Sequence, residues 1–209
     1  MEPPTSSLSQ ANIEYQLRNI QRYNPDVQFV DPEHFEIAID PTTWTEFETK
    51  ERRRIIEFTA VFDFKPTFIP QVIVHWRPID PSQYQSSRPN SHSISVILDE
   101  GRAVLTSVDI ISSAETFFAT RFCTGEKNRI RRGFESSGPN TLHKGGSELY
   151  SCIQGFNNPK PRNIDKSVKV FPAVVFRSLI EKICSNYVST TSSSISLTPD
   201  CYCGHAVQE

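Results

Sequence analysis

The segment Ile55-Ile-Glu-Phe-Thr-Ala-Val-Phe-Asp-Phe64 carries an apolar side chain at every second position, which predicts a half-buried β-strand. Residues 72–76 and 93–98 predict a second and a third strand, because both are rich in β-branched residues. Prolines punctuate the segment between the first two strands, and a polar, proline-containing loop follows the second at residues 78–90. Short strands at this spacing are typical of a β-sandwich or jelly roll.

The rest of the chain adds shorter elements to this predicted sandwich. Segments with strand character lie at residues 35–39, 103–111, 116–123, 149–156 and 168–176. Apolar residues at helical spacing predict a short N-terminal helix at residues 9–23, and residues 176–187 fit a closing C-terminal helix. We therefore predict an all-β fold, an antiparallel jelly-roll-like β-sandwich. Its domain would span residues 11–188, between a flexible N-terminus at 1–10 and a Ser/Thr-rich tail at 189–209.

The composition is that of a chain with an aromatic-rich core and no overall positive charge. Of the 209 residues, 37% are hydrophobic and 11% aromatic, which is enough for a substantial core. The net charge of −2 excludes a globally cationic nucleic-acid coat, so any phosphate contact must come from a local patch. We find neither a signal peptide nor a membrane-spanning segment, and an odd number of scattered cysteines predicts reduced thiols. These features favour a cytoplasmic location.

The strongest local charge lies in a glycine-rich segment after the predicted strands. Six of the eight glycines fall between residues 125 and 155, around a basic run of Lys127, Arg129, Arg131 and Arg132. Lys144 follows, and Lys160 and Arg162 extend the set toward the next strand. A flexible, cationic loop on a β scaffold can bring its backbone and its arginines close to phosphates, which predicts a nucleic-acid contact. An ordinary solvated loop would have the same composition.

Two other clusters receive different interpretations. Arg52, Arg53 and Arg54 are surrounded by glutamates, so we expect a solvated, salt-bridged face there. Cys201, Cys203 and His205 have residue types that bind zinc, but they supply three ligands where a structural site needs four. Zinc at these residues is only an alternative, and we predict no metal and no cofactor. No spacing of nucleophile and base suggests catalysis, so we predict that the protein is not an enzyme.

Two neighbouring motifs resemble a known family. They are Val72-Ile-Val-His-Trp-Arg-Pro78 and, after a polar loop, Ser93-Ile-Ser-Val-Ile-Leu-Asp99-Glu-Gly-Arg102. Residues 55–123 resemble the core of viral single jelly-roll proteins, namely the plant-virus movement-protein superfamily and related RNA-virus coat proteins. The resemblance implies binding of single-stranded RNA without sequence preference, self-association, and a fold-stabilising role for Asp99 in a turn.

Three functions remain open at this point. The first is a non-enzymatic viral movement or coat protein that self-associates and binds single-stranded RNA through the basic glycine-rich loop. The second is an immunoglobulin-like DNA-binding domain of a transcription factor, in which that loop would grip duplex DNA. The third is a β-sandwich adaptor for another protein, whose identity no motif encodes.

Overall fold

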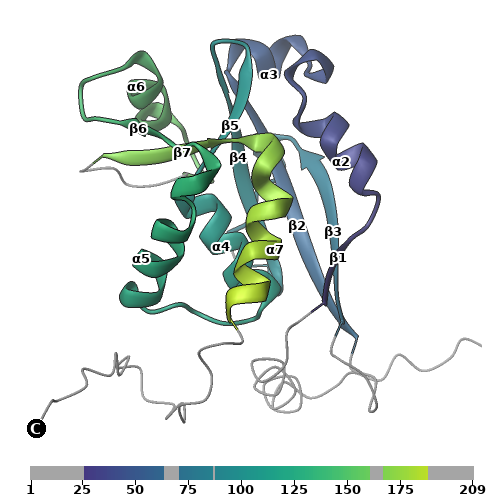
Figure 1. Cartoon of the computed structure of the whole chain (residues 1–209). Coiled ribbons are helices and arrows are strands. Elements are labelled where there is room, and N and C mark those ends of the chain that lie inside the picture. Colours follow the sequence, from purple (N-terminus) through teal and green to yellow (C-terminus); the bar gives the residue numbers. More distant parts are fainter. Residues whose placement is uncertain (1–25, 64–70, 87, 161–166, 188–209) are drawn as a thin grey trace, which may run out of the picture.

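One mixed sheet of seven strands organises the structure (Figure 1). The computed structural model describes residues 26–63, 71–86, 88–160 and 167–187. Within this part the strand order is β1-β3-β2-β4-β5-β7-β6. The strands are β1 (Asp26–Phe29), β2 (Arg53–Asp63), β3 (Gln71–Ile79), β4 (Ser91–Asp99), β5 (Arg102–Thr106), β6 (Asn140–Leu142) and β7 (Val168–Pro172).

Six α-helices accompany the sheet in the described part of the chain. They are α2 (Pro32–Ile39), α3 (Glu46–Lys50), α4 (Ser107–Phe117), α5 (Thr124–Gly133), α6 (Glu148–Gly155) and α7 (Phe176–Tyr187). Short 3-10 turns lie at η1 (Pro41–Thr43), η2 (Pro81–Gln83), η3 (Glu135–Ser137) and η4 (Ala173–Val175). Figure 1 shows α4 and α7 lying against the sheet, with α5 next to them.

The predicted all-β, antiparallel, jelly-roll-like sandwich is wrong. β1 pairs with β3 in parallel, whereas the other neighbouring strands pair antiparallel, so the sheet is mixed. The described strands form one sheet, and helices cover it where a sandwich would place a second sheet. The architecture is therefore α+β.

The three central strands predicted from the sequence are confirmed as β2, β3 and β4. β2 pairs with β3 from Ile55 to Asp63 and with β4 from Arg53 to Thr59, both antiparallel. The predicted turn after β4 is also confirmed, because Glu100 and Gly101 connect β4 to β5 with φ angles of 46° and 79°. Two positive φ values in a two-residue loop match the twist of a tight hairpin.

Helices replace several of the predicted strands. Residues 35–39 belong to α2 and residues 149–155 to α6. In the strand predicted at 103–111, residues 103–106 are confirmed as β5, but α4 takes residues 107–111 and also the first two residues of the strand predicted at 116–123. N-caps start two of these helices: Thr106 Oγ1 accepts from the backbone N–H of Asp109 (3.2 Å), and Ser147 Oγ accepts from that of Tyr150 (3.1 Å). Short apolar runs suit a strand or a buried helix equally well, so periodicity alone did not distinguish them.

The C-terminal part of the prediction holds better. β7 occupies the first residues of the strand predicted at 168–176, and α7 confirms the closing helix at 176–187. The predicted helix at residues 9–23, the flexible segment 1–10 and the tail at 189–209 lie outside the described residues.

The larger core lies between the sheet and helices α2, α4 and α7. Phe58 of β2 stacks on Phe176 of α7 with ring centroids 5.3 Å apart, and Phe117 of α4 meets Phe58 edge-on at 5.5 Å. Leu179 and Ile180 of α7 are also buried in this core. Because aromatic rings bury the most apolar area per side chain, this cluster fixes α4 and α7 against the sheet.

A second core lies on the opposite face of the sheet under α6. Val96 of β4 enters the first core, whereas its neighbour Ile97 packs in the second with Tyr150 and Ile153 of α6. Successive residues of a strand point to opposite faces, so helices cover both faces of β4. On β3, by contrast, His75 and Arg77 are exposed on the second face.

Candidate nucleic-acid interface

The basic run predicted as a flexible loop is a helix, α5. Its first turn is closed by a capping box, in which the Cys123 backbone N–H donates to Glu126 (2.9 Å) and the Glu126 N–H donates to Cys123 Sγ (3.4 Å). Gly125 and Gly133 lie in the first and last turns, where glycine interrupts a helix least. The loop prediction is therefore wrong, and the cations are presented at helical spacing.

Lys127 faces inward and joins α5 to α4. Its Nζ lies 2.9 Å from Oε1 of Glu115, whose side chain is only 2% exposed. Glu115 also accepts from the backbone N–H of Phe122 (2.7 Å) and from Arg121 Nη1 (3.4 Å). Since a buried carboxylate must be compensated, Lys127 is committed to holding Glu115.

Arg129, Arg131 and Arg132 remain for the surface of α5. Arg129 and Arg132 are exposed and lie three residues apart, which places them on neighbouring turns of one helix face. Arg131 is half-buried and donates from Nη1 to Asn128 Oδ1 (3.0 Å). Arg131 and Arg132 also stabilise the last turn of α5, because cations interact favourably with a helix C-terminus.

Lys182 of α7 adds a cation that the sequence interpretation missed. Its Nζ donates to the carbonyl oxygen of Gly133 (2.6 Å) and to Ser136 Oγ (3.0 Å). Lys182 thus fixes the C-terminal end of α5 to α7. Forty-nine residues separate Lys182 from Gly133, so only the packing of the two helices brings them together.

A pocket of about 240 Å³ opens between α5 and α7. Residues of both helices and the residue that follows α5 line it, namely Arg129, Ile130, Gly133, Phe134, Lys182, Ile183 and Asn186. Its wall therefore combines apolar groups with two cations.

The remaining predicted cations do not join α5. Lys144 is exposed in the connection between β6 and α6, and Lys160 is exposed after α6, which lies apart from α5 in Figure 1. Arg162 lies outside the described residues. The single extended basic surface expected from the sequence is thus reduced to α5 and Lys182.

The alternative zinc ligands Cys201, Cys203 and His205 also lie outside the described residues. Within residues 26–63, 71–86, 88–160 and 167–187, no group of three or more metal-binding side chains comes together.

Burial disfavours the thiolate form of two of the described cysteines, Cys152 and Cys184. Among the described residues, Cys123, Cys152 and Cys184 are not joined in disulfides. Burial raises the pKa of Cys184 to about 12 and also raises the pKa of Cys152. Because the thiolate is the nucleophile, neither thiol is activated at neutral pH.

The expected solvated face at Arg52, Arg53 and Arg54 is wrong for its last two members. Arg53 and Arg54 are 9% and 7% exposed, and Glu57 pairs with Arg77 (2.7 Å) and Arg88 (3.0 Å) instead. Arg52 behaves more as expected, since it pairs with exposed Glu148 at 2.7 Å.

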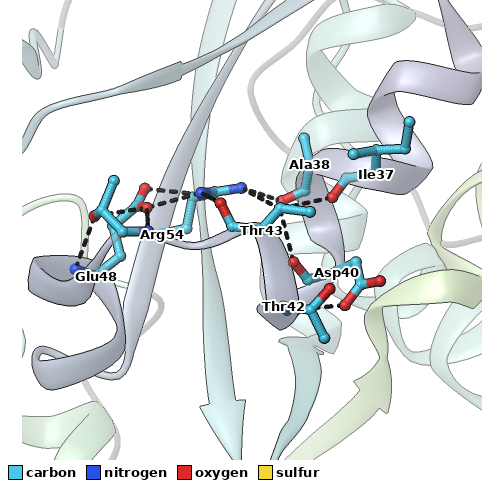
Figure 2. A network of polar contacts seen from close by, with 8 residues as sticks. Ile37, Ala38, Asp40, Thr42, Thr43, Glu48 and Arg54 are labelled. Atoms are coloured by element: carbon cyan, nitrogen blue, oxygen red, sulfur yellow. Dashed lines mark hydrogen bonds and ion pairs between the residues drawn. The ribbon is translucent and has the colours of Figure 1, made fainter.

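Arg54 holds together four elements at one end of the sheet (Figure 2). Its guanidinium donates to both carboxylate oxygens of Glu48 at 2.8 Å, to the carbonyl of Ala38 at 2.6 Å and to that of Thr43 at 3.0 Å. It thereby ties β2 to α2, η1 and α3. These bonds depend on the planar fork of arginine, which lysine lacks.

Arg53 performs the same task on the opposite face. Its guanidinium donates to Ser95 Oγ at 2.8 Å and to the carbonyl of Asn157 at 2.9 Å, and also to that of Pro159. It lies over the ring of Phe156, 4.7 Å from the centroid. Burial lowers the pKa of Arg53 to about 10, which still leaves it charged at neutral pH.

Asp99 lies in the β4–β5 hairpin, where the resemblance to viral proteins placed a turn residue. Its carboxylate is 3.8 Å from Arg52, and its backbone faces Arg102 across the turn. Burial, followed by the neighbouring charge of Glu100, raises its pKa.

Comparison with known proteins places the chain in a family. The model of a domain of unknown function, DUF7082, matches residues 36–184, which run from α2 to α7. The chain belongs to the DUF7082 family. The matched part of this DUF7082 protein includes the whole of α5 and the pocket residues up to Ile183.

Neither curated proteins nor solved structures gave a match to the chain. The resemblance to viral proteins therefore stays a prediction, although the jelly-roll fold that it implied is wrong. None of the helices in the described ranges has the length and apolar character needed to cross a membrane.

Proposed function

We propose that this DUF7082 protein is a non-enzymatic nucleic-acid-binding protein that contacts backbone phosphates through the arginines of α5. The observation that carries the proposal is the exposure of Arg129 and Arg132 on one face of α5, beside Lys182 of α7. Three cations within one surface region suit successive phosphates, because phosphate contacts require positive charge and no fixed sequence.

The division of labour within α5 supports this proposal. Lys127 is committed to Glu115, whereas Arg129 and Arg132 are exposed on the surface of α5. Arg129 is exposed one turn before the C-terminus, and it lines the pocket instead of packing into the core. Single-stranded RNA, the ligand expected from the sequence, remains the first one to test.

The non-enzymatic part of the proposal has its own support. Burial raises the pKa of the Cys152 and Cys184 thiols, and the most buried arginines are bonded to protein groups that hold the fold. The exposed cations of α5 suit the binding of an anionic ligand.

The proposal is tested by binding of labelled single-stranded RNA and of duplex DNA at low salt, measured by fluorescence anisotropy. The test variant is Arg129→Ala with Arg132→Ala. We expect at least ten-fold weaker binding, since a charged hydrogen bond contributes roughly 1.5–3 kcal/mol and about 1.4 kcal/mol is ten-fold in affinity.

Lys144→Ala with Lys160→Ala is the matched control, because it removes the same charge from exposed positions outside α5. If both double variants lose the same affinity, the α5 arginines act only through the net charge of the protein, and the proposal is contradicted. If the native protein binds neither single-stranded RNA nor duplex DNA, the proposal is also contradicted, and the function as an adaptor for another protein is favoured. Light scattering on the same samples measures the self-association that the resemblance implies.

A further inference from the structure

The pocket between α5 and α7 has an apolar floor. Phe134 and Ile183 are 1% and 3% exposed, and half-buried Ile130 packs against the same core. Phe134 is itself fixed by an edge-on contact with Phe171 of β7, at 5.6 Å between ring centroids. These side chains favour an occupant with an apolar face.

The rim of the pocket is polar and cationic. Arg129 contributes from α5, and Lys182 and Asn186 contribute from α7. Lys182 bonds to the carbonyl of Gly133 (2.6 Å), and Asn186 donates to the carbonyl of Lys182 (2.8 Å), so the rim is held in place by its own hydrogen bonds. A preformed rim lowers the entropic cost of binding.

The size of the pocket limits the occupant. Its volume of about 240 Å³ lies below the roughly 300–1,000 Å³ typical of sites for drug-sized ligands. A single ring system with a neighbouring anionic group fits this pocket. Its faces are apolar like the floor, and its polar edges and negative charge suit the polar, cationic rim. An unstacked base with its phosphate has all three.

We propose that this pocket receives one unstacked base of a single-stranded nucleic acid whose phosphates lie along the arginines of α5. The inference rests on the proposed function and names the ligand class, because a base inside a duplex is stacked and paired and cannot enter. Single strands expose their bases to apolar and aromatic side chains and to arginine, which is how proteins commonly distinguish them from duplexes.

Gly133 offers a way to fill the pocket without disturbing the fold. A Cβ at this position would meet nothing within 4 Å, and the φ angle of Gly133 is not in the left-handed region. Because Gly133 lines the pocket, Gly133→Leu adds a bulky side chain at the pocket wall, and Gly133→Ala, which adds one methyl group, is the matched control. Neither variant removes a cation.

The experiment measures the affinity of the full chain for a short oligouridylate, for the same strand with one abasic position moved along it, and for an RNA duplex. We expect Gly133→Leu to bind the intact single strand about ten-fold or more weakly than the native protein does, since it loses the contact with one base. Gly133→Ala should bind it as the native protein does, and duplex affinity should be unchanged in both variants.

A strand with its abasic site in the right register should bind the native protein and Gly133→Leu equally weakly. If Gly133→Leu retains the native preference for single strands while Arg129→Ala with Arg132→Ala loses binding, the pocket inference is overturned and the proposed function stands. If the native protein binds none of the three probes, both are overturned.

Discussion

Two basic runs of similar composition have opposite positions in this molecule. Arg53 and Arg54 lie on a central strand and are buried, where their guanidinium groups bond to carbonyls and to Glu48. Arg129 and Arg132 lie on a surface helix and are exposed. The sequence interpretation had the first run solvated and the second on a flexible loop.

The comparison shows that a basic run is informative only together with its secondary structure. Because successive residues of a strand point to opposite faces, Arg53 and Arg54 lie on opposite faces of β2. Other elements cover each face, and each guanidinium bonds to the backbone of those elements. Helix geometry turns Lys127 inward and leaves Arg129 and Arg132 outside. Charge neutralisation by neighbouring glutamates in the sequence does not reveal this difference.

The largest effect that we predict comes from breaking the buried run. Arg54→Met should destabilise the protein by about 3–5 kcal/mol, because it leaves Glu48 and two carbonyls without their donor. Arg54→Lys should cost less, because an ammonium keeps the charge but cannot reach every acceptor. Urea unfolding measures both, with Arg132→Met as the matched control, which should stay within about 0.5 kcal/mol of the native protein. An equal loss from Arg132→Met would remove the contrast between the two runs.

A second prediction uses Asp109, a buried carboxyl whose charge interacts with Arg53. Burial raises its pKa to about 7 from 3.8, so the folded state binds the proton more tightly, and its contribution to stability falls as the pH rises from about 4 to about 7. Asp109→Asn removes this dependence. From about pH 4 to about pH 7 the native protein should therefore lose up to ~4 kcal/mol of stability relative to Asp109→Asn.

His92 makes the Asp109 prediction sharper, because its dependence has the opposite sign. Burial, then the charge of Arg121, lowers its pKa to about 4, so the unfolded state binds more protons between pH 4 and 6.5 and stability rises with pH there. Glu115 also faces His92 and opposes this shift. Urea unfolding at several pH values should show a steeper rise for Asp109→Asn than for the native protein. If stability depends on pH in the same way in Asp109→Asn and in the native protein, the raised pKa assigned to Asp109 is wrong.

A third, smaller effect separates two cations within α5. Lys127→Met should cost about 1–3 kcal/mol, because Glu115 then loses a charged donor while it stays buried. Its effect on the number of phosphate contacts should be slight. Thermal unfolding and RNA binding should be measured on the two single variants Lys127→Met and Arg132→Met. Lys127→Met should lower the stability and leave RNA affinity nearly unchanged, whereas Arg132→Met should weaken RNA binding and leave the stability nearly unchanged. If Lys127→Met unfolds as the native protein does and binds RNA more weakly, the inward assignment of Lys127 is wrong.

The sequence predicted the elements whose signals are local and repeated. The alternation in residues 55–64 and the hairpin signal at Asp99–Gly101 identified β2 and the β4–β5 turn. The spacing of Leu179, Ile180 and Ile183 identified α7. Each signal follows directly from strand, turn or helix geometry.

The wrong elements have weaker local signals. Phe35, Ile37 and Ile39 alternate as in a strand, yet Pro32 lies in the first turn of an eight-residue helix. The glycines at 125 and 133 suggested a loop, but the capping box of Cys123 and Glu126 closes a helix between them. Serine and threonine are common outside helices and cysteine is an unusual N-cap, so these caps can be recognised only when the helix is known.

The candidate site could be predicted only in part. The sequence identified Arg129, Arg131 and Arg132 from their charge. It could not identify Lys182 or the apolar floor of the pocket, because β6, α6 and β7 separate α5 from α7 along the chain. Such long-range contacts leave no spacing pattern in the chain.

The central claim is that the exposed run binds phosphates and the buried run does not, and the salt dependence of RNA affinity tests it most directly. Each phosphate contact on a single strand contributes a slope of about −0.7 to log K against log salt. Arg129→Ala with Arg132→Ala should make the slope less steep by about 1.4, the sum for two contacts. Lys144→Ala with Lys160→Ala should leave it unchanged. An unchanged slope in the α5 variant would contradict the account.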